Sequence, residues 1–363
     1  MKAGIVGCGN ISRAYLSNGK KFKHLEIVAC ADMRPEASKA AAAEYGIRDL
    51  TVEQLLEDKS IDTVLNLTTP ESHVEINTRA LQAGKNVHCE KPFGLDREGA
   101  KKVISLAAKK GLRVGCAPDT FLGGGHQTCR KIIDDGVIGK VVCGTAFMLC
   151  HGHESWHPAP GFYYRKGGGP LFDMGPYYIT ALVNMLGPVK RVAALSNRST
   201  NKRIGIKANA GKTFPVEIDT HISATLEFAQ GAIVTLITSF DVWRTSGYRD
   251  IELHGTEGSL HVPDPNNFNG DIRIYKQGFI SDWAPAENDF GYNDNLRIIG
   301  LADMAAGIAN KRPHRTSGEL AFHVLDVMCS IADSAANNIA VKLASTCERP
   351  AALRTGLKGG ELD

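Results

Sequence analysis

Short apolar runs alternate with stretches of helical periodicity over the first 120 residues. Residues 2–7 and 25–32 are apolar runs that match strands, whereas residues 35–46 have a helical pattern with a proline in the first turn and a glycine at the end. A strand and a helix in turn build right-handed βαβ units, whose strands lie parallel. The pattern therefore predicts a doubly wound parallel sheet over residues 1–120, with strands at 2–7, 25–32, 61–69, 86–92 and 112–118.

A different pattern follows residue 120. A glycine-rich loop leads into a helix within 120–139, and two further helices are expected at 291–310 and 316–337. Between them, many runs alternate apolar and polar residues with period two, which is typical of strands with one buried face. The pattern predicts an α+β domain over 121–340, followed by an irregular tail over 341–363. Its expected strands are 140–150, 190–198, 217–228, 231–240, 248–255, 258–263 and 271–276.

The first strand runs directly into a glycine loop, Gly7-Cys8-Gly9-Asn10-Ile11-Ser12. The first glycine allows a tight turn, and the second lets a pyrophosphate approach the backbone at a helix N-terminus, where free N–H groups favour an anion. Serine replaces the usual third glycine, and a small side chain can still fit there. Asp32 ends the second strand about 20 residues later, where a carboxylate would bind a ribose hydroxyl. These features predict a Rossmann dinucleotide-binding domain.

Asp32 also bears on the choice of cofactor. Its carboxylate can accept a hydrogen bond from a ribose 2′-hydroxyl and would repel a 2′-phosphate, so we expect NAD. Arg34, two residues later, could instead balance a phosphate or be a solvated surface charge. NADP is therefore the less favoured alternative.

Composition and charge exclude several classes of protein. The chain has 363 residues, 43% of them hydrophobic, and a net charge of +3, which gives no electrostatic footprint for nucleic acid or for an anionic membrane surface. No apolar run reaches the roughly 18 residues of a membrane helix, and no signal peptide is expected. The nine scattered cysteines indicate reduced thiols in a cytoplasmic protein. A sheet with one open face also predicts a homodimer or homotetramer.

Residues 153–157 read H-E-x-x-H, the zinc-protease pattern when it lies on a helix. Here the motif follows a strand-like run, and prolines at 158 and 160 disfavour helical backbone before them. We therefore expect a loop and no metal site. Its rings could line a sugar pocket or pack as a structural aromatic loop. The predicted substrate contacts in this loop are His153, Trp156 and Tyr164.

Three further stretches, NLTTPESH at 66–73, GKNVHCEKPFG at 84–94 and GGGPLFDMGPYY at 167–178, resemble the glucose–fructose oxidoreductase/inositol dehydrogenase (Gfo/Idh/MocA) family. The resemblance covers nearly the whole chain. It implies a nucleotide domain, then a domain with a large, open, mostly antiparallel sheet, and hydride transfer between a nicotinamide and a sugar or polyol. Lys91 and Asp173 match the family's catalytic lysine and aspartate. Tyr177 stands where the family usually has a histidine.

The remaining site predictions follow from position in this pattern. His73 could close over the cofactor or cap its own helix, and His126 and Gln127 could bind substrate hydroxyls or cap theirs. The helical spacing of four places Asp173 and Tyr177 on one face, where they could form a proton relay with Lys91. The predicted cofactor contacts are Gly7, Gly9, Asn10, Ile11, Asp32, Arg34, Thr69, Pro70, His73, Glu90, Lys91 and Asp119.

Three functions are compatible with these residues. The favoured one is an NAD-dependent sugar or polyol dehydrogenase in which Lys91 takes the hydroxyl proton, assisted by Asp173 and Tyr177. The first alternative is a glycosidase that uses tightly held NAD for transient oxidation, elimination and re-reduction. The second is a nucleotide-binding sensor without chemistry.

Overall fold

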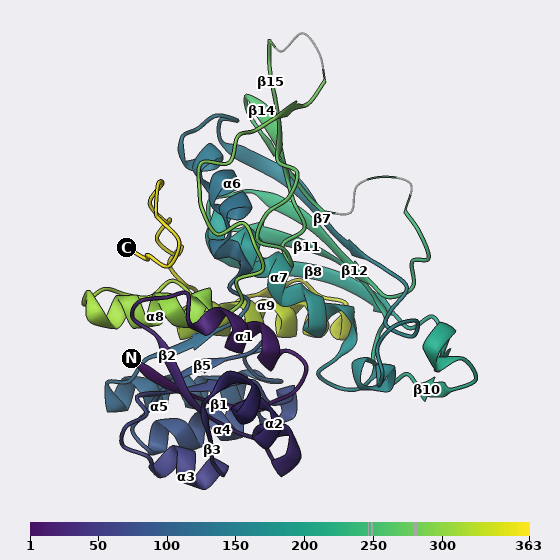
Figure 1. Cartoon of the computed structure of the whole chain (residues 1–363). Coiled ribbons are helices and arrows are strands. Elements are labelled where there is room, and N and C mark those ends of the chain that lie inside the picture. Colours follow the sequence, from purple (N-terminus) through teal and green to yellow (C-terminus); the bar gives the residue numbers. More distant parts are fainter. Residues whose placement is uncertain (246, 248–249, 279–281) are drawn as a thin grey trace. The chain divides into compact units, whose positions relative to one another are not determined.

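The computed structural model describes residues 1–245, 247, 250–278 and 282–363, and the chain divides into two compact units (Figure 1). The first unit comprises 1–127, 289–322 and 350–363, and the second comprises 128–288 and 323–349. The first unit therefore gathers segments from far along the sequence, whereas the predicted boundaries were contiguous. None of the described helices is both long and apolar enough to span a bilayer.

A parallel sheet forms the centre of the first unit. Its six described strands lie in the order β3-β2-β1-β4-β5-β6, and every neighbouring pair is parallel. The doubly wound prediction is therefore confirmed, with one short strand, β3, that the apolar pattern did not indicate. The strands are β1 Lys2–Val6, β2 Glu26–Ala31, β3 Arg48–Asp49, β4 Thr63–Asn66, β5 Asn86–Cys89 and β6 Val114–Cys116.

The helices of this unit begin and end where local chemistry requires. Helix α2 has Pro35 at its first position, and Gly46 after its end takes a left-handed conformation with φ of 68°. Thr51 and Gln54 form a reciprocal capping box at the start of α3. The helices are α1 Ser12–Gly19, α2 Pro35–Tyr45, α3 Val52–Glu57, α4 Pro70–Gln82, α5 Arg97–Lys110 and α8 Ile299–Ala309, with a 3₁₀ turn, η1, at Thr120–Leu122.

Helix α8 corrects one prediction, because the expected helix 291–310 begins only at Ile299. Tyr292 and Ile298 have positive φ values of 64° and 110°, which an α-helix cannot contain. The predicted helix within 120–139 is α6 Gly124–Asp134, and the predicted helix 316–337 is α9 Gly318–Asn337.

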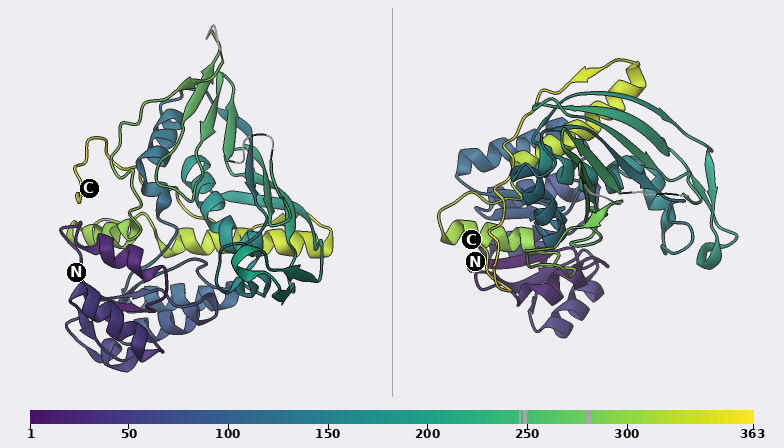
Figure 2. Two further views of the ribbon diagram at one scale, coloured as in Figure 1. Left: turned by 45° about the vertical axis from the view of Figure 1, so that its right-hand side comes forward. Right: turned by 90° about the horizontal axis from the view of Figure 1, so that it is seen from above.

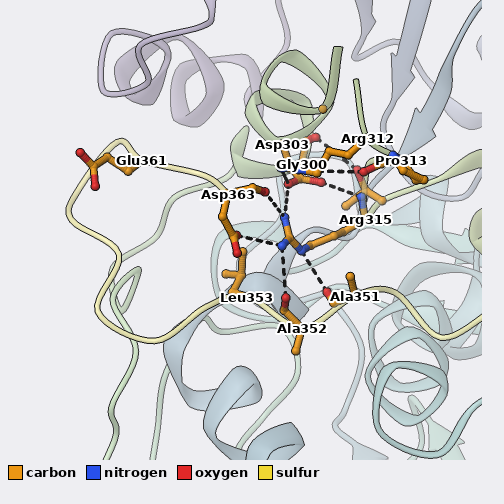
Figure 3. A network of polar contacts seen from close by, with 12 residues as sticks. Gly300, Asp303, Arg312, Pro313, Arg315, Ala351, Ala352, Leu353, Glu361 and Asp363 are labelled. Atoms are coloured by element: carbon orange, nitrogen blue, oxygen red, sulfur yellow. Dashed lines mark hydrogen bonds and ion pairs between the residues drawn. The ribbon is translucent and has the colours of Figure 1, made fainter. Parts of the chain in front are cut away.

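The irregular tail predicted over 341–363 is wrong at its start, because Val341–Lys342 forms the short strand β17, which pairs with β8. The segment 350–363 is irregular and packs into the first unit. Arg315 holds it by donating to the backbone oxygens of Ala351 and Ala352 and to the side chain of Asp363 at 2.9 Å (Figure 3). The same guanidinium bonds Asp303 at 2.6 Å. One buried arginine thus joins this segment to helix α8.

A larger sheet forms the second unit. Its nine described strands lie in the order β16-β15-β14-β13-β7-β12-β11-β8-β17, antiparallel except for β7 and β12. Helix α7 packs on β7, β11 and β12 of this sheet (Figure 2). Helix α9 is joined to β8 by Ser334, whose hydroxyl accepts the Ala194 N–H. Burial alternates along β11, as the period-two pattern predicts. The prediction of a large, mostly antiparallel sheet is confirmed.

The second unit has these bounds. The strands of the large sheet are β7 Val141–Leu149, β8 Val189–Asn197, β11 His221–Phe228, β12 Ile233–Ser239, β13 Ile251–Gly255, β14 Gly258–Val262, β15 Arg273–Lys276, β16 Ala284–Pro285 and β17 Val341–Lys342. The other elements are the pair β9 Lys202–Ile204 and β10 Thr213–Pro215, helix α7 Gly169–Leu186, and the 3₁₀ turns η2 Pro160–Tyr164 and η3 Lys207–Asn209. The predicted strand 248–255 starts with two residues outside the described part of the chain.

Candidate functional site

The glycine loop between β1 and α1 has the geometry of a dinucleotide cradle. Gly7 has φ of 102°, and a Cβ there would lie 2.6 Å from the carbonyl carbon and oxygen of Leu67, so only glycine fits. A Cβ at Gly9 would meet nothing within 4 Å, so the backbone is open to an approaching ligand. Ser12 begins α1, and its hydroxyl donates to the Gly9 oxygen at 2.7 Å. Serine therefore closes the loop where the third glycine is missing.

Asp32 fixes this loop from the end of β2. Its carboxylate accepts the Cys8 N–H at 2.7 Å and the Arg34 N–H at 2.8 Å, and the Arg34 Nε lies 3.5 Å away. A carboxylate can accept about four hydrogen bonds, so capacity remains for a ribose hydroxyl. Beside it lies a cavity of about 430 Å³, lined by the loop, the start of α1 and the exposed side of α2. These residues fit the adenosine and pyrophosphate half of a dinucleotide, and Asn10 and Ile11 lie in the same loop.

Lys91 lies in the loop after β5. The Lys91 N–H donates to the Glu90 carboxylate at 2.8 Å, and the Lys91–Pro92 peptide bond is cis. The other oxygen of Glu90 accepts the Tyr15 hydroxyl, also at 2.8 Å. The backbone of Lys91 is thereby fixed, while its catalytic role stays a prediction.

His73 joins two loops through both ring nitrogens, and its predicted closure over the cofactor stays a prediction. Its ring is fully buried, with Nδ1 2.7 Å from the Pro92 oxygen and Nε2 3.0 Å from the Thr68 oxygen. Burial by itself lowers the pKa of His73, but the neighbouring Cys89 and the two carbonyls outweigh it and raise that pKa to about 9. Thr69 and Pro70 begin helix α4 beside this contact.

Asp119 has a structural partner that the sequence did not reveal. Its carboxylate accepts the N–H groups of Ile298 and Gly300, both at 3.0 Å, at the start of α8. Burial raises the pKa of Asp119 to about 6, although these two donors act in the opposite direction. The predicted cofactor contact is thus engaged in capping a helix.

Gln127 is also used internally. Its amide donates to the Phe121 oxygen at 2.8 Å and accepts the Leu353 N–H at 2.7 Å, so it ties the 350–363 segment to the first unit. His126 beside it is 1% exposed. Both side chains are enclosed in the interior, which argues against their predicted contact with substrate hydroxyls.

In the second unit, Asp173 in the first turns of α7 pairs with His153. The Asp173 Oδ2 and His153 Nε2 atoms are 3.1 Å apart, and both side chains are about nine-tenths buried. The rings of Tyr163, Phe240 and Trp156 surround the imidazole, at centroid distances of 3.8, 4.9 and 5.2 Å. This pair combines a hydrogen-bond acceptor with a group that can carry a proton.

The two histidines of the H-E-x-x-H segment have different partners. His153 meets Asp173, whereas the His157 Nδ1 accepts the Ala159 N–H at 3.1 Å. Residues 151–159 form turns, as predicted, and no group of three potential metal ligands occurs among the described residues. Glu154 occupies the position of the general base in the zinc-protease pattern. Its side chain is 1% exposed, and its Oε1 lies 3.4 Å from the Nη1 of Arg203.

Arg203 was not indicated by any pattern in the sequence, yet it organises this aromatic loop. Its guanidinium pairs with Glu154 and Asp241, donates to the Phe240 oxygen at 2.8 Å and lies over the Tyr164 ring at 5.5 Å. Tyr164 is fully buried. Its pKa is raised mainly by this burial and, to a lesser extent, by the neighbouring Glu154 carboxylate. This burial argues against the predicted contact of Tyr164 with substrate. The tyrosine whose ring packs on His153 is the adjacent Tyr163.

Tyr177 and Trp156 differ in accessibility. Tyr177 follows Asp173 by one helical turn but is only 7% exposed. Trp156 is 62% exposed and presents its indole beside His153. Trp156 is thus open to a ligand, whereas the side chain of Tyr177 is buried and its catalytic role stays a prediction.

Comparison with known proteins agrees with both units. Residues 1–117 match the model of the oxidoreductase family with an NAD-binding Rossmann fold, and residues 126–261 match that of the GFO/IDH/MocA C-terminal domain. The chain is 30% identical over 365 residues to D-glucoside 3-dehydrogenase of Escherichia coli (strain K12), covering 94% of this chain and 97% of the relative. It is 28% identical to inositol 2-dehydrogenase of Rhizobium meliloti (strain 1021), covering 72% and 74%.

A solved structure has the same fold. Levoglucosan dehydrogenase in complex with NADH and L-sorbose superposes with a TM-score of 0.81 at 21% identity, covering 95% of this chain and 99% of that one. The two family models and this structural likeness cover the dinucleotide loop, the parallel sheet and the large, mostly antiparallel sheet. The chain belongs to the Gfo/Idh/MocA family of NAD-binding oxidoreductases.

Proposed function

We propose that this protein is an NAD-dependent dehydrogenase that interconverts a secondary alcohol and a ketone on a sugar, polyol or glycoside ring. The observation that carries the proposal is the 3.1 Å pairing of Asp173 with His153 under aromatic rings, in a chain that also has a dinucleotide loop. Hydroxyls bind well to such a carboxylate–imidazole pair, and C–H faces of a sugar ring pack on aromatic side chains. The named activities of the glucoside and inositol relatives support a ring with neighbouring hydroxyls.

The chain's own residues have distinct roles in this reaction. A bound NAD would supply the acceptor for the hydride that leaves the carbinol carbon. Lys91 takes the proton of the reacting hydroxyl. Asp173 binds a hydroxyl and orients His153, which provides a second route for the proton. Tyr177, one turn along α7 from Asp173, assists from a buried position.

NAD is the proposed cofactor because of Asp32. Its carboxylate already accepts two backbone N–H groups and would repel a phosphate on the ribose. Arg34 is partly compensated by the same carboxylate, with its Nε 3.5 Å from Oδ1. The balance therefore favours a free 2′-hydroxyl over a 2′-phosphate.

The large sheet supports a homodimer or homotetramer. Val142, Leu195 and Ile233, on three of its strands, are 49–67% exposed. A second copy of this chain could cover such apolar side chains. Light scattering coupled to size-exclusion chromatography would give the mass directly, and a monomer at micromolar concentration would contradict this part of the proposal.

The activity test is a substrate panel with both cofactors. The purified protein is mixed with NAD or NADP and with myo-inositol, D-glucose, 1,5-anhydro-D-glucitol and methyl D-glucosides, and absorbance of the reduced cofactor is followed. We expect turnover with NAD on at least one ring polyol. No turnover on the whole panel, with NAD binding intact, would overturn the proposal. Release of nitrophenol from an aryl glycoside that needs NAD but accumulates no NADH would favour the glycosidase alternative.

A further inference from the structure

A buried polar link joins helix α1 to the loop that carries Lys91. The Tyr15 hydroxyl donates to the Glu90 Oε1 at 2.8 Å, and the Glu90 Oε2 accepts the Lys91 N–H at 2.8 Å. Tyr15 is fully buried and Glu90 is 8% exposed. The two oxygens of one enclosed carboxylate are thus divided between a helix and a loop that lie 75 residues apart in the sequence.

This link connects the dinucleotide-binding part of the first unit with the loop of the proposed catalytic lysine. Tyr15 is in the helix that follows the dinucleotide loop, one turn after Ser12. At the other end, the Glu90 N–H donates to the Asn66 oxygen of β4 at 2.8 Å, and the Pro92 oxygen meets His73. Hydrogen bonds to β4 and to His73 of α4 therefore fix the backbone on either side of Lys91. The Tyr15–Glu90 bond adds a third connection, to the helix that follows the dinucleotide loop.

Such a link has a mechanical consequence. A buried carboxylate is stable only when its oxygens are hydrogen-bonded, and charge-assisted bonds are short and directional. Without the Tyr15 hydroxyl, the Glu90 side chain can rotate toward other donors and release the Lys91 N–H. Small displacements of a reacting group are costly, since roughly 1 Å of misplacement can reduce a rate about a hundredfold.

We propose that Tyr15 is a positioning residue that acts through Glu90 to fix Lys91 relative to the dinucleotide loop. This inference rests on the proposed role of Lys91 in proton transfer. Tyr15 itself touches neither substrate nor reacting atoms. Its removal should therefore affect the chemical step more than the binding of either ligand.

The first experiment compares two tyrosine-to-phenylalanine variants. Tyr15→Phe removes only the hydroxyl that bonds Glu90, and Tyr292→Phe removes a hydroxyl that donates to the backbone oxygens of Lys358 and Glu361 in the same unit. With the best substrate of the panel, we expect Tyr15→Phe to lower kcat roughly tenfold or more while KM and the Kd of NADH change less than twofold. Tyr292→Phe should keep the kcat of the parent protein. Equal kcat in the parent and Tyr15→Phe would overturn the inference.

The second experiment separates positioning from simple support. Glu90→Met has no side-chain oxygen, so it can accept neither the Tyr15 hydroxyl nor the Lys91 N–H. If Tyr15 acts through Glu90, the double variant will be no slower than the slower single variant, whereas independent structural effects would multiply. Mass spectrometry can also measure how fast acetic anhydride acetylates each lysine side chain. The acetylation rate of Lys91 should differ between Tyr15→Phe and the parent, whereas that of Lys102 should be the same in both.

Lys91→Met distinguishes the two possible failures. Turnover that survives Lys91→Met would refute the proposed role of Lys91 and, with it, this inference. Loss of turnover in Lys91→Met together with unchanged kcat and Lys91 labelling in Tyr15→Phe would refute the positioning role alone. Should Tyr15→Phe fail to fold, Glu90→Met carries the same test, and normal kcat and labelling in that variant would overturn the inference.

Discussion

The Nε2 atom of His153 lies 3.1 Å from the Oδ2 atom of Asp173, so a loop residue and a helix residue 20 positions apart form one polar pair. The family motif led to the expectation that a residue four positions after the aspartate would be its partner. In this chain, that residue is Tyr177, whose side chain is buried, and the imidazole beside Asp173 comes from the aromatic loop. The pair is therefore the part of the second unit on which activity should depend most.

Asp173→Asn and His153→Asn should each reduce kcat/KM by about 10² to 10⁴, the range for loss of a group that binds and exchanges protons with a substrate. Asp173→Asn keeps the shape but removes the charge that orients the imidazole. Tyr178→Phe is the matched control on the same helix, and it should stay within about threefold of the parent because its hydroxyl donates to the backbone oxygen of Phe147 in β7. Steady-state kinetics with the best panel substrate measure all three, and a fully active Asp173→Asn would contradict the assigned role.

Replacing Asp32 tests cofactor choice. Asp32→Ser removes the carboxylate that would repel a 2′-phosphate, and it also removes an acceptor for the Cys8 N–H. We expect the Kd of NAD to rise about tenfold or more, since a hydrogen bond to a charged group contributes about 1.5–3 kcal/mol, and discrimination against NADP to fall. Isothermal titration with each dinucleotide measures both effects. Arg34→Ala is the companion variant, and unchanged NAD/NADP selectivity in Asp32→Ser would mean that the carboxylate does not set it.

The sequence predicted those parts of the molecule that local patterns determine. Gly7, Gly9 and Asp32 occupy fixed positions around a strand, a turn and a helix, and the structure has the same elements there. The larger sheet followed from period-two alternation. Strand β3, with two exposed residues, has no apolar run that could have revealed it.

The errors came from partners far apart in the sequence. Asp119 follows a strand, as a cofactor ligand would, but it bonds the start of a helix about 180 residues later. Arg203 lies in a short polar segment, and only folding brings it to Glu154 and Asp241. Such assignments require tertiary contacts, and periodicity carries no information about them.

Arg315 should be important for stability. Arg315→Met leaves Asp303, which is fully buried, with fewer donors and releases Asp363 and the carbonyls of the 350–363 segment (Figure 3). Breaking a buried ion pair costs about 3–5 kcal/mol, and Arg312, 2.7 Å from the same carboxylate, places the expected loss at the lower end. Urea unfolding measures the change. Lys102→Met, which breaks an exposed pair with Glu98, should leave the midpoint unchanged, and equal midpoints for Arg315→Met and the parent would refute the tie.

His323 should make the second unit sensitive to acid. Its Nε2 accepts the Val189 N–H at 3.0 Å, so the fold requires the neutral ring, and burial lowers the pKa of His323 to about 4. Because this pKa lies below its value of about 6.5 in the unfolded chain, the stabilisation is complete above pH 6.5 and is lost as the pH falls toward 4. Between pH 7 and pH 5 the linkage amounts to about 2 kcal/mol. Urea titrations should show that the loss of stability from pH 7 to pH 5 is larger in the parent than in His323→Gln, which cannot titrate, by about this amount. An identical pH dependence in both proteins would show that another group is responsible.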